Sequence, residues 1–257
     1  MNGCSTPRFD RSVAERCAFE YVVGPRADRL LVLADHATAY VPPGVDLGIS
    51  EEDRTRHIGI DIGAAAVARG VAERECAPAI LGGCSRLVID LNRPASDDAA
   101  VPAISDGTRI PGNERLSAEQ LEVRHAVHAA YHRRVERALD DESPRLILSV
   151  HSFTSRMRGG SSKRPWDCGL LYDRDDRAAR AAIAYFERQG LIVGDNEPYS
   201  GARFGYTMQR HAEPRAIPYL FLEIRNDHLS DAGGLARWMD LTVGAVSAAL
   251  GEGGAGS

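Results

Sequence analysis

Two apolar segments of this chain each end on a histidine, and this feature limits the possible folds most. The first is LLVLADH at residues 30–36, and the second is LILSVH at residues 146–151. Short, continuously apolar segments are typical of strands that are buried on both faces of a parallel sheet. In open α/β sheets, ligands bind just beyond the carboxyl ends of the strands. His36 and His151 are therefore predicted to lie at a binding edge, where two imidazoles suggest a metal site.

Charge and cysteine content exclude several classes of protein. The 257 residues include 36 acidic and 31 basic side chains, and both signs are spread along the chain, so the basic stripe typical of nucleic-acid binding is missing. The five cysteines form no CxxC pair, so we expect no disulfide framework and a cytoplasmic protein. No segment reaches the ~18 apolar residues of a membrane span, and the amino terminus lacks the apolar stretch of a signal peptide. We expect neither nucleic acid nor membrane as a partner.

Apolar segments alternate with helical patterns along most of the chain. Strands are predicted at residues 19–23, 30–34, 78–81, 87–91, 146–150, 169–172, 191–193 and 219–224. Helices are predicted at residues 60–73, 117–139, 177–189 and 234–250, the second of them behind the capping box SAEQ. This alternation favours an α/β fold in which helices flank both faces of a mixed, mostly parallel sheet. We expect a single three-layer domain over residues 1–250 and a disordered, glycine-rich tail at residues 251–257.

Asp61 is the candidate for a third metal ligand. Each histidine taken alone can be a hydrogen-bonded core residue, but zinc bound by two imidazoles normally needs a further His, Asp or Glu. Asp61 is an isolated carboxylate at the apolar start of a predicted helix, where it costs free energy unless it is paired or ligating. Its alternative role is to stabilise the helix N-terminus through the macrodipole.

Glu223 is the candidate for a general base. It lies near the end of the otherwise apolar segment PYLFLEI at residues 218–224. Burial there would raise its pKa, and such a carboxylate beside a metal-bound water can take a proton and pass it to a leaving nitrogen. The alternative is a structural ion pair with Arg225 or another arginine.

The segment SRLVIDLNR at residues 85–93 supplies groups that suit an anionic substrate. Arg93 offers a planar fork and Asn92 an amide for binding a carboxylate, and Arg86 could polarise a carbonyl or hold an oxyanion. The alternatives are that Arg86 is a surface charge at a strand edge, and that Asp90 is a buried partner of one of these arginines.

The remaining histidines suggest weaker hypotheses. His125, His128 and His132 share one face of the predicted helix at 117–139, but arginines are interleaved with them, so we expect a solvated or partner-facing surface rather than a second metal site. His211 is expected to help to bind substrate. The Pro- and Gly-rich segment 94–112 is expected to form a long surface loop or a lid.

Five short motifs, in order, carry a resemblance to a known family. They are Asp35-His36-Ala37, Asp61-Ile62-Gly63-Ala64, Ser85 to Arg93, Val150-His151-Ser152-Phe153, and Glu223-Ile224-Arg225-Asn226-Asp227. In this order the motifs resemble those of the N-formylglutamate amidohydrolase family, which is distantly similar to aspartoacylases and zinc carboxypeptidases. The resemblance spans roughly residues 32–229. It implies a carboxypeptidase-like member of the phosphorylase/hydrolase-like α/β folds.

The resemblance also implies a role for each matched residue. His36 and His151 would bind one zinc ion or another divalent metal, Glu223 would activate water, and Arg86 would hold the carbonyl oxygen. Asn92 and Arg93 would bind the substrate carboxylate, together with Arg225 of the last motif. Ala39 stands where relatives carry a glutamate ligand in His-x-x-Glu, so Asp61 is assigned as the third ligand instead.

The expected function is therefore zinc-dependent hydrolysis of the N-formyl or other N-acyl amide of an acidic amino acid such as N-formylglutamate. The partner would be a small-molecule N-acyl amino acid, and no oligomeric state is predicted. The alternatives are a hydrolase of a different N-acyl amino acid or small peptide, and a non-catalytic relative that binds carboxylates. The loops at residues 94–112 and 155–164 would set the size of the pocket.

Overall fold

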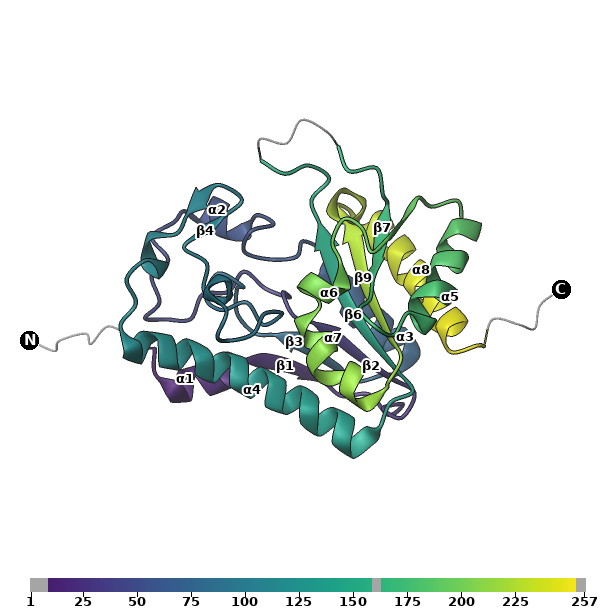
Figure 1. Cartoon of the computed structure of the whole chain (residues 1–257), viewed down its shortest axis with the longest axis horizontal. Coiled ribbons are helices and arrows are strands. Elements are labelled where there is room, and N and C mark those ends of the chain that lie inside the picture. Colours follow the sequence, from purple (N-terminus) through teal and green to yellow (C-terminus); the bar gives the residue numbers. More distant parts are fainter. Residues whose placement is uncertain (1–8, 159–162, 253–257) are drawn as a thin grey trace, which may run out of the picture.

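A seven-stranded mixed sheet forms the centre of the computed structural model, which describes residues 9–158 and 163–252 (Figure 1). Its strands are β1 (Phe19–Val22), β2 (Leu30–Ala34), β3 (Ala79–Gly82), β6 (Leu146–Phe153), β7 (Cys168–Leu171), β8 (Val193–Asp195) and β9 (Tyr219–Arg225). The strand order is β1-β3-β2-β6-β9-β7-β8. Only the β1–β3 and β7–β9 pairs of this sheet are antiparallel. The expectation of a mixed, mostly parallel sheet in a single α/β domain is confirmed.

Helices cover both faces of this sheet. They are α1 (Arg11–Cys17), α2 (Glu51–Thr55), α3 (Ala64–Glu75), α4 (Ala118–Glu142), α5 (Arg177–Arg188), α6 (Gly201–Phe204), α7 (Tyr206–His211) and α8 (Ala232–Ala249). Helices α3, α5 and α8 pack together on one face, and α4 lies with α1 and α7 on the other (Figure 1). In the described part of the chain no helix is long and apolar enough to cross a membrane.

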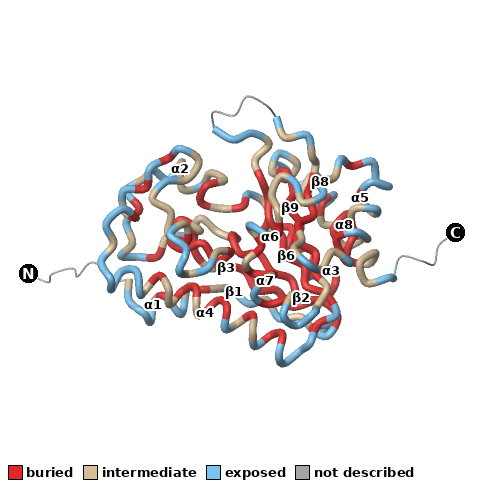
Figure 2. The backbone as a smooth tube through the Cα atoms, in the orientation of Figure 1, coloured by how far each residue is buried: buried red, intermediate tan, exposed pale blue. Residues whose placement is uncertain are grey.

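Residues of β2 alternate between the two apolar clusters of the core. Leu30, Val32 and Ala34 belong to the cluster under α3, α5 and α8, whereas Leu31 and Leu33 belong to the cluster under α4. Successive side chains of a strand point to opposite faces, so a strand covered on both sides must be apolar throughout. All residues of β2, β6 and β9 are buried, which Figure 2 shows as the centre of the molecule. A polar residue within these strands is therefore exceptional.

Two predicted elements differ from the structure near the site. Residues 87–91 are not a strand: the Val88 N–H donates to Ser85 O in a turn, and the side chain of Arg124 donates to Val88 O. Side chains of other elements thus bind backbone groups of this segment that would otherwise pair with a neighbouring strand. Helix α3 begins at Ala64 instead of residue 60, because Gly63 caps it in a left-handed conformation with φ of 80°.

Other boundaries shift by a few residues. Helix α4 carries the predicted capping box at Ser117 and Gln120 but continues to Glu142, where Ser143 ends it with φ of 46°. Within the expected loop at 94–112, the structure has a short hairpin of β4 (Ile104–Ser105) and β5 (Thr108–Arg109). Strand β8 begins where the predicted strand at 191–193 ends.

The last described residue, Glu252, lies within the predicted tail and contacts the domain. Glu252 forms ion pairs with Arg29 and Arg145, and its N–H donates to Ser247 O, which holds it against the domain. Residues 253–257 lie outside the described part of the chain.

Candidate metal centre

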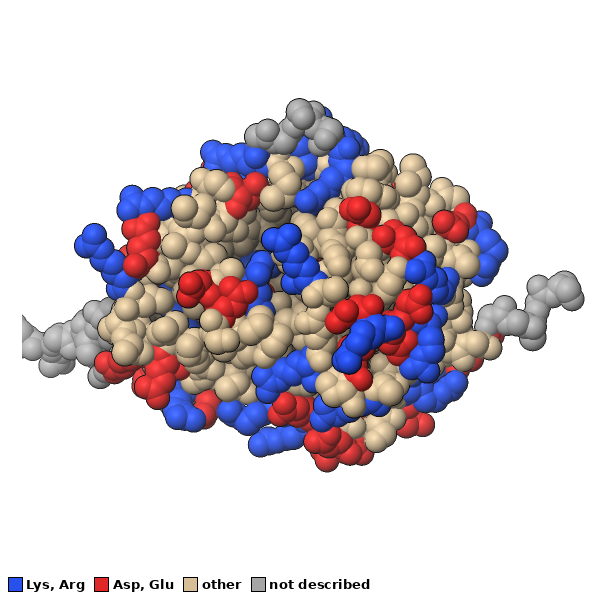
Figure 3. All heavy atoms as spheres, viewed as in Figure 1, with Lys and Arg blue, Asp and Glu red and all other residues tan. Residues whose placement is uncertain are grey.

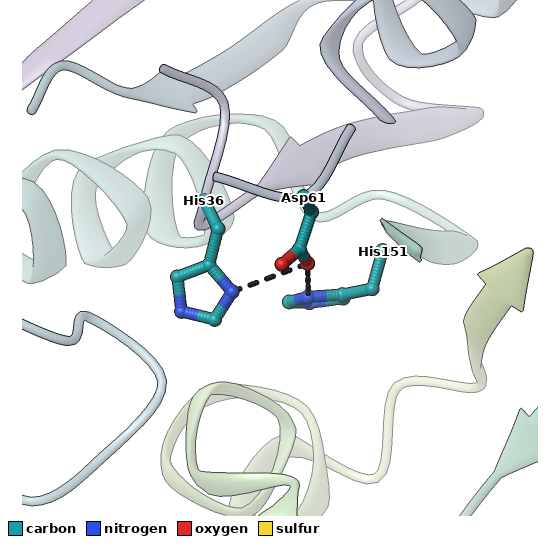
Figure 4. A group of neighbouring side chains, drawn as sticks. All are labelled: His36, Asp61 and His151. Atoms are coloured by element: carbon teal, nitrogen blue, oxygen red, sulfur yellow. Dashed lines mark hydrogen bonds and ion pairs between the residues drawn. The ribbon is translucent and has the colours of Figure 1, made fainter. Parts of the chain in front are cut away.

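The two strand-end histidines meet at one edge of the sheet. Strands β2 and β6 are adjacent and parallel, so His36, just after β2, and His151, within β6, reach the same edge. Their ring centroids are 5.2 Å apart. Asp61 lies on the segment before α3, and its N–H donates to His36 O, which places its side chain between the two rings (Figure 4).

Asp61 contacts both histidines through the same oxygen. Its Oδ2 lies 3.2 Å from His36 Nδ1 and 2.8 Å from His151 Nδ1. The three side chains are buried, and their candidate ligand atoms all lie within 4.8 Å of one another. Two imidazole nitrogens and a carboxylate oxygen are a donor set that suits zinc and related divalent ions. The residues that the sequence singled out as ligands thus form one compact cluster.

Each histidine holds a second carboxylate at its far nitrogen. His36 Nε2 lies 2.7 Å from Asp90 Oδ1, and His151 Nε2 lies 3.3 Å from Asp35 Oδ2. Metal-binding histidines usually donate their other ring N–H to such a partner, which fixes the tautomer and the ring orientation. Both rings therefore turn Nδ1 toward a common point beside Asp61, an arrangement that fits a metal ion.

The cluster attracts positive charge. Burial by itself lowers the pKa of the His151 imidazole, but the hydrogen bonds and charges of Asp35 and Asp61 outweigh this effect and raise that pKa to about 10. Burial likewise opposes ionisation of Asp61, yet the two histidines and Arg86 hold its pKa well below the ordinary value. A cation between these carboxylates, whether a proton or a metal ion, is electrostatically favoured.

Glu223 stands next to this cluster on the neighbouring strand. Strand β9 pairs with β6 in a register that places Glu223 opposite His151. The Glu223 side chain is buried, and among the described residues its Oε2 has no hydrogen-bond partner. Burial, reinforced by the charge of Asp61, raises its pKa to about 7 despite the nearby His151 and Arg86. This is the protonation range of a group that exchanges protons at neutral pH.

Arg86 is bound on two sides within the site. Its Nη1 donates to Asp61 Oδ1 at 3.2 Å and its Nη2 to Asp90 Oδ2 at 2.7 Å. The Arg86 side chain remains 28% exposed and borders the cavity described below. The interpretation of Asp90 as a buried partner of an arginine is confirmed, and Arg86 is paired with two buried carboxylates instead of being a surface charge at a strand edge.

Asn92 and Arg93 have different surroundings. The Asn92 amide donates from Nδ2 to Phe204 O and accepts at Oδ1 from the Thr207 N–H, so it bridges the junction of α6 and α7. Arg93 is 29% exposed and lies 3.6 Å from Asp90 and 3.5 Å from Asp97, longer distances than those of Arg86. Of this pair, Arg93 has the polar group that is better placed to bind a ligand.

A cavity of about 180 Å³ opens beside the cluster. Figure 3 shows the surface hollowed between the part of the chain that holds α2 and the part that holds β9, with basic side chains near the hollow. The cavity is lined by His36, His57, Asp61, Arg86, Asp90, Asn92, Arg93, His151, Ser152, Phe153, Thr154, Tyr199, Phe204 and Glu223. All three candidate ligands, Glu223, Arg86, Asn92 and Arg93 thus surround one space.

Two residues expected at the substrate lie elsewhere. His211 is fully buried in α7, with its Nε2 2.8 Å from His132 Nδ1. Arg225 donates to Trp166 O and to Asp227, so it holds the segment before β7 instead of lining the cavity. Packing and internal hydrogen bonds occupy both side chains and neither lines the cavity, so their contact with substrate stays a prediction.

The expected solvated face of α4 is wrong for His128 and His132. Both are buried, and their Nε2 atoms lie 2.9 Å from Arg93 O and Leu91 O respectively. Burial lowers the pKa of both imidazoles, which keeps them neutral. They hold the backbone on which Asn92 and Arg93 stand, and they form no metal cluster in the described chain.

Aromatic residues and a histidine also line the cavity, although the sequence did not predict them there. Phe153 ends a motif that resembles the family, but nothing in the local pattern of Phe153 or Tyr199 indicated a wall of the site. Phe204 and His57 carried no such signal. His57 Nε2 lies 3.0 Å from Asp106 Oδ2 at the turn between β4 and β5, so it connects the hairpin to the cavity.

The fold and the site together define an α/β protein with a candidate metal centre beside a cavity. The family model for N-formylglutamate amidohydrolases matches residues 28–230, most of the chain. The chain belongs to the N-formylglutamate amidohydrolase family and is a hydrolase that acts on an amide.

Two crystal structures show the same architecture. Gene product Atu2144 from Agrobacterium tumefaciens is 30% identical, with a TM-score of 0.88 over 95% of this chain and 98% of that one. N-formylglutamate amidohydrolase from Ralstonia eutropha JMP134 is 18% identical, with a TM-score of 0.70 over 91% of this chain and 98% of that one. The second similarity concerns the fold alone. No curated protein matches the chain significantly in sequence.

Proposed function

We propose that the protein is a metal-dependent amidohydrolase that removes the formyl or another small acyl group from an N-acyl amino acid. The observation that carries this proposal is the position of the buried Glu223 in the same cavity as the His36–Asp61–His151 cluster, with an Oε2 that has no hydrogen-bond partner among the described residues. An unsatisfied buried polar atom costs about 1–3 kcal/mol, so a merely structural role explains it poorly. Membership of the family supports amide hydrolysis.

His36, Asp61 and His151 would hold one divalent ion, for which zinc is the natural choice by donor type. Zinc in such a site supplies a bound water of lowered pKa and a Lewis acid for the carbonyl oxygen of the substrate. Asp90 and Asp35 contact the Nε2 atoms of the two imidazoles and so orient the rings.

Glu223 moves the proton. With a pKa near 7 it accepts a proton from the attacking water and delivers that proton to the amide nitrogen as the C–N bond breaks. The oxygen of water ends on the acyl carbon, which leaves as a carboxylate, formate for a formyl group. The other product is the amino acid with a free amine.

Two arginines orient the substrate and stabilise charge. Arg86, held by Asp61 and Asp90, offers its partly exposed guanidinium to the oxygen on which negative charge develops. Arg93 binds the carboxylate of the amino acid. Both side chains border the cavity on which Glu223 lies.

The cavity of about 180 Å³ adjoins a second one of about 280 Å³, and the two together bound the space for substrate. They share the lining residues His57, Arg86, Asp90, Arg93 and Tyr199. A carboxylate-binding relative without catalysis would use Arg93 but would have no use for a buried base beside a metal-type cluster.

The test is the variant Glu223→Gln, which keeps the shape of the side chain and removes the base. We expect bound zinc, measured by elemental analysis, to stay near one per chain, and hydrolysis of N-formyl amino acids to fall by about 10²–10⁴-fold. Glu122→Gln, on the exposed side of α4, is the matched control and should behave as the wild type. Undiminished turnover in Glu223→Gln would refute the proposed role.

A further inference from the structure

Two guanidinium groups lie around the ring of Phe204, which forms part of the wall of the cavity. The Cζ of Arg93 is 5.7 Å from the ring centroid, and the Cζ of Arg203 is 5.1 Å from it. Both distances lie within the ~6 Å over which an aromatic face attracts a cation. Phe204 and Arg93 border the cavity, and Arg203 precedes Phe204 in α6. Two positive charges therefore accompany one aromatic residue of the site.

The amide of Asn92 fixes the two arginine-bearing segments relative to each other. Its Nδ2 donates to Phe204 O at 2.8 Å, and its Oδ1 accepts from the Thr207 N–H at 2.9 Å. Asn92 is the neighbour of Arg93 in the chain, as Phe204 is of Arg203. Because the Asn92 side chain is buried, these hydrogen bonds are shielded from water. The proximity of the two arginines thus follows from an internal contact of the fold.

Neither of these guanidinium groups is neutralised by a close carboxylate. Arg93 lies 3.6 Å from Asp90 and 3.5 Å from Asp97, beyond the about 2.7–2.9 Å of a charge-assisted hydrogen bond. The Arg203 side chain is exposed and makes no ion pair or hydrogen bond with any residue that the structure describes. Two cations around one ring repel each other, and an anionic ligand that binds between them relieves this repulsion.

The other basic groups near the cavity are less available to a ligand. Both ends of the Arg86 guanidinium are paired with buried carboxylates. Arg164 Nη1 donates to the Tyr199 hydroxyl at 3.0 Å. Burial lowers the pKa of His57, so its imidazole is neutral at pH 7. Of the described basic residues at the cavity and its aromatic wall, the two around Phe204 are therefore the ones left to bind two carboxylates of one ligand.

We propose that Arg203 recognises the side-chain carboxylate of an N-acyl dicarboxylic amino acid, while Arg93 binds the α-carboxylate. This inference rests on the proposed function and assigns a specificity-determining residue to it. Arg203 does not itself border the cavity, but among the described residues only the Phe204 ring holds its guanidinium. The exposed side chain can therefore turn toward a ligand without breaking an ion pair. Each carboxylate then meets its own guanidinium, and neither charge loses water without a partner.

The test is Arg203→Met, which keeps an apolar contact with Phe204 and removes the charge. Full-length, zinc-loaded protein is given N-formylglutamate and N-formylglutamine, which have similar shapes and differ by one charge, and kcat and KM are measured from amine release. We expect kcat/KM to fall at least about tenfold with N-formylglutamate, mainly through KM, and less than about twofold with N-formylglutamine. Equal losses with the two substrates, or no loss with N-formylglutamate, would overturn the inference while leaving the proposed function intact.

Arg134→Met is the matched control. Arg134 also lies over an aromatic ring, 3.8 Å from the centroid of Tyr21, but it does not border the cavity. The variant removes the same charge from the protein, so kcat/KM for both substrates should stay within about twofold of the wild type. A loss with N-formylglutamate as large as that in Arg203→Met would show that the overall charge, and not Arg203, sets the preference.

Failure of the proposed function gives a different result. If the wild type hydrolyses neither compound, the activity is wrong, and the role of Arg203 is then measured by binding. In calorimetric titrations, adding Arg203→Met to Glu223→Gln should weaken binding of N-formylglutamate at least about tenfold and leave that of N-formylglutamine unchanged. No binding of N-formylglutamate to Glu223→Gln, or an unchanged affinity in the double variant, would refute the role of Arg203.

Discussion

Asp35 Oδ2 lies 3.3 Å from His151 Nε2, and this contact connects the candidate metal centre to two helices. The same carboxylate accepts hydrogen bonds from the Tyr131 hydroxyl at 2.6 Å and the Thr207 hydroxyl at 3.0 Å. Tyr131 belongs to α4 and Thr207 to α7, so both helices determine the position of Asp35. The orientation of His151 thus depends on how helices α4 and α7 hold Asp35.

Asp35→Asn should weaken metal binding more than it weakens the fold. The amide cannot offer both lone pairs and the negative charge that the carboxylate presents to His151, so we expect zinc affinity to fall about 10–100-fold. Competition with a chromophoric chelator measures this affinity. Asp141→Asn, at an exposed position of α4, is the matched control. Equal affinities of the two variants would show that Asp35 does not act on the metal site.

Arg93→Ala should impair substrate binding and leave chemistry largely intact. A hydrogen-bonded contact with a charged group contributes about 1.5–3 kcal/mol, which corresponds to a rise in KM of roughly 10–150-fold. Steady-state kinetics with an N-formyl amino acid measures KM and kcat separately. The corresponding N-formyl amino acid amide lacks the carboxylate and should be equally poor with both proteins. A fall in kcat alone would argue against a carboxylate contact.

Stability should decrease in mild acid because of the buried His211. Burial and the charge of Arg210 lower its pKa from 6.5 to about 4 in the folded state. The unfolded chain therefore binds the proton more readily. The neutral imidazole stabilises the fold fully above pH 6.5, and this contribution is lost progressively between pH 6.5 and 4, by up to ~3 kcal/mol.

The check is the free energy of unfolding in urea at pH 7.5 and pH 5. We expect His211→Gln to lose less stability between the two pH values than the wild type, whatever its absolute stability. His125→Gln, on the same helix as His132 but partly exposed, should keep the pH dependence of the wild type. An unchanged difference in His211→Gln would exclude His211 as the source.

Gly63→Ala should destabilise the segment that carries Asp61. Gly63 has φ of 80°, and an added Cβ would lie 2.5 Å from Leu229 Cβ. Gly107 has a similar φ of 73° but open space around it, so Gly107→Ala measures the conformational strain alone. We expect a loss of about 1–2 kcal/mol for Gly107→Ala and a further ~1–3 kcal/mol for Gly63→Ala, measured by urea unfolding. Equal losses would show that the contact with Leu229 relaxes without cost.

Local sequence determined the central strands and the polar residues at their ends. The segments around β2, β6 and β9 could be predicted because strands covered on both faces must be continuously apolar. In that context a histidine or glutamate stands out, so His36, His151 and Glu223 were recognised without any knowledge of their partners. The capping box at Ser117 was equally local, because both its hydrogen bonds join residues three positions apart.

Only the tertiary structure decided which side chains face the cavity. Residues 87–91 have the composition of a strand. The side chains of Asn113 and Arg124, however, donate hydrogen bonds to backbone carbonyls of this segment, which stays irregular. His128 and His132 have the pattern of a solvated helix face, yet the segment 91–93 covers them. Phe204 reaches the site across more than a hundred residues of sequence, through the Asn92 amide. Such contacts depend on the packing of distant segments, and no local pattern encodes them.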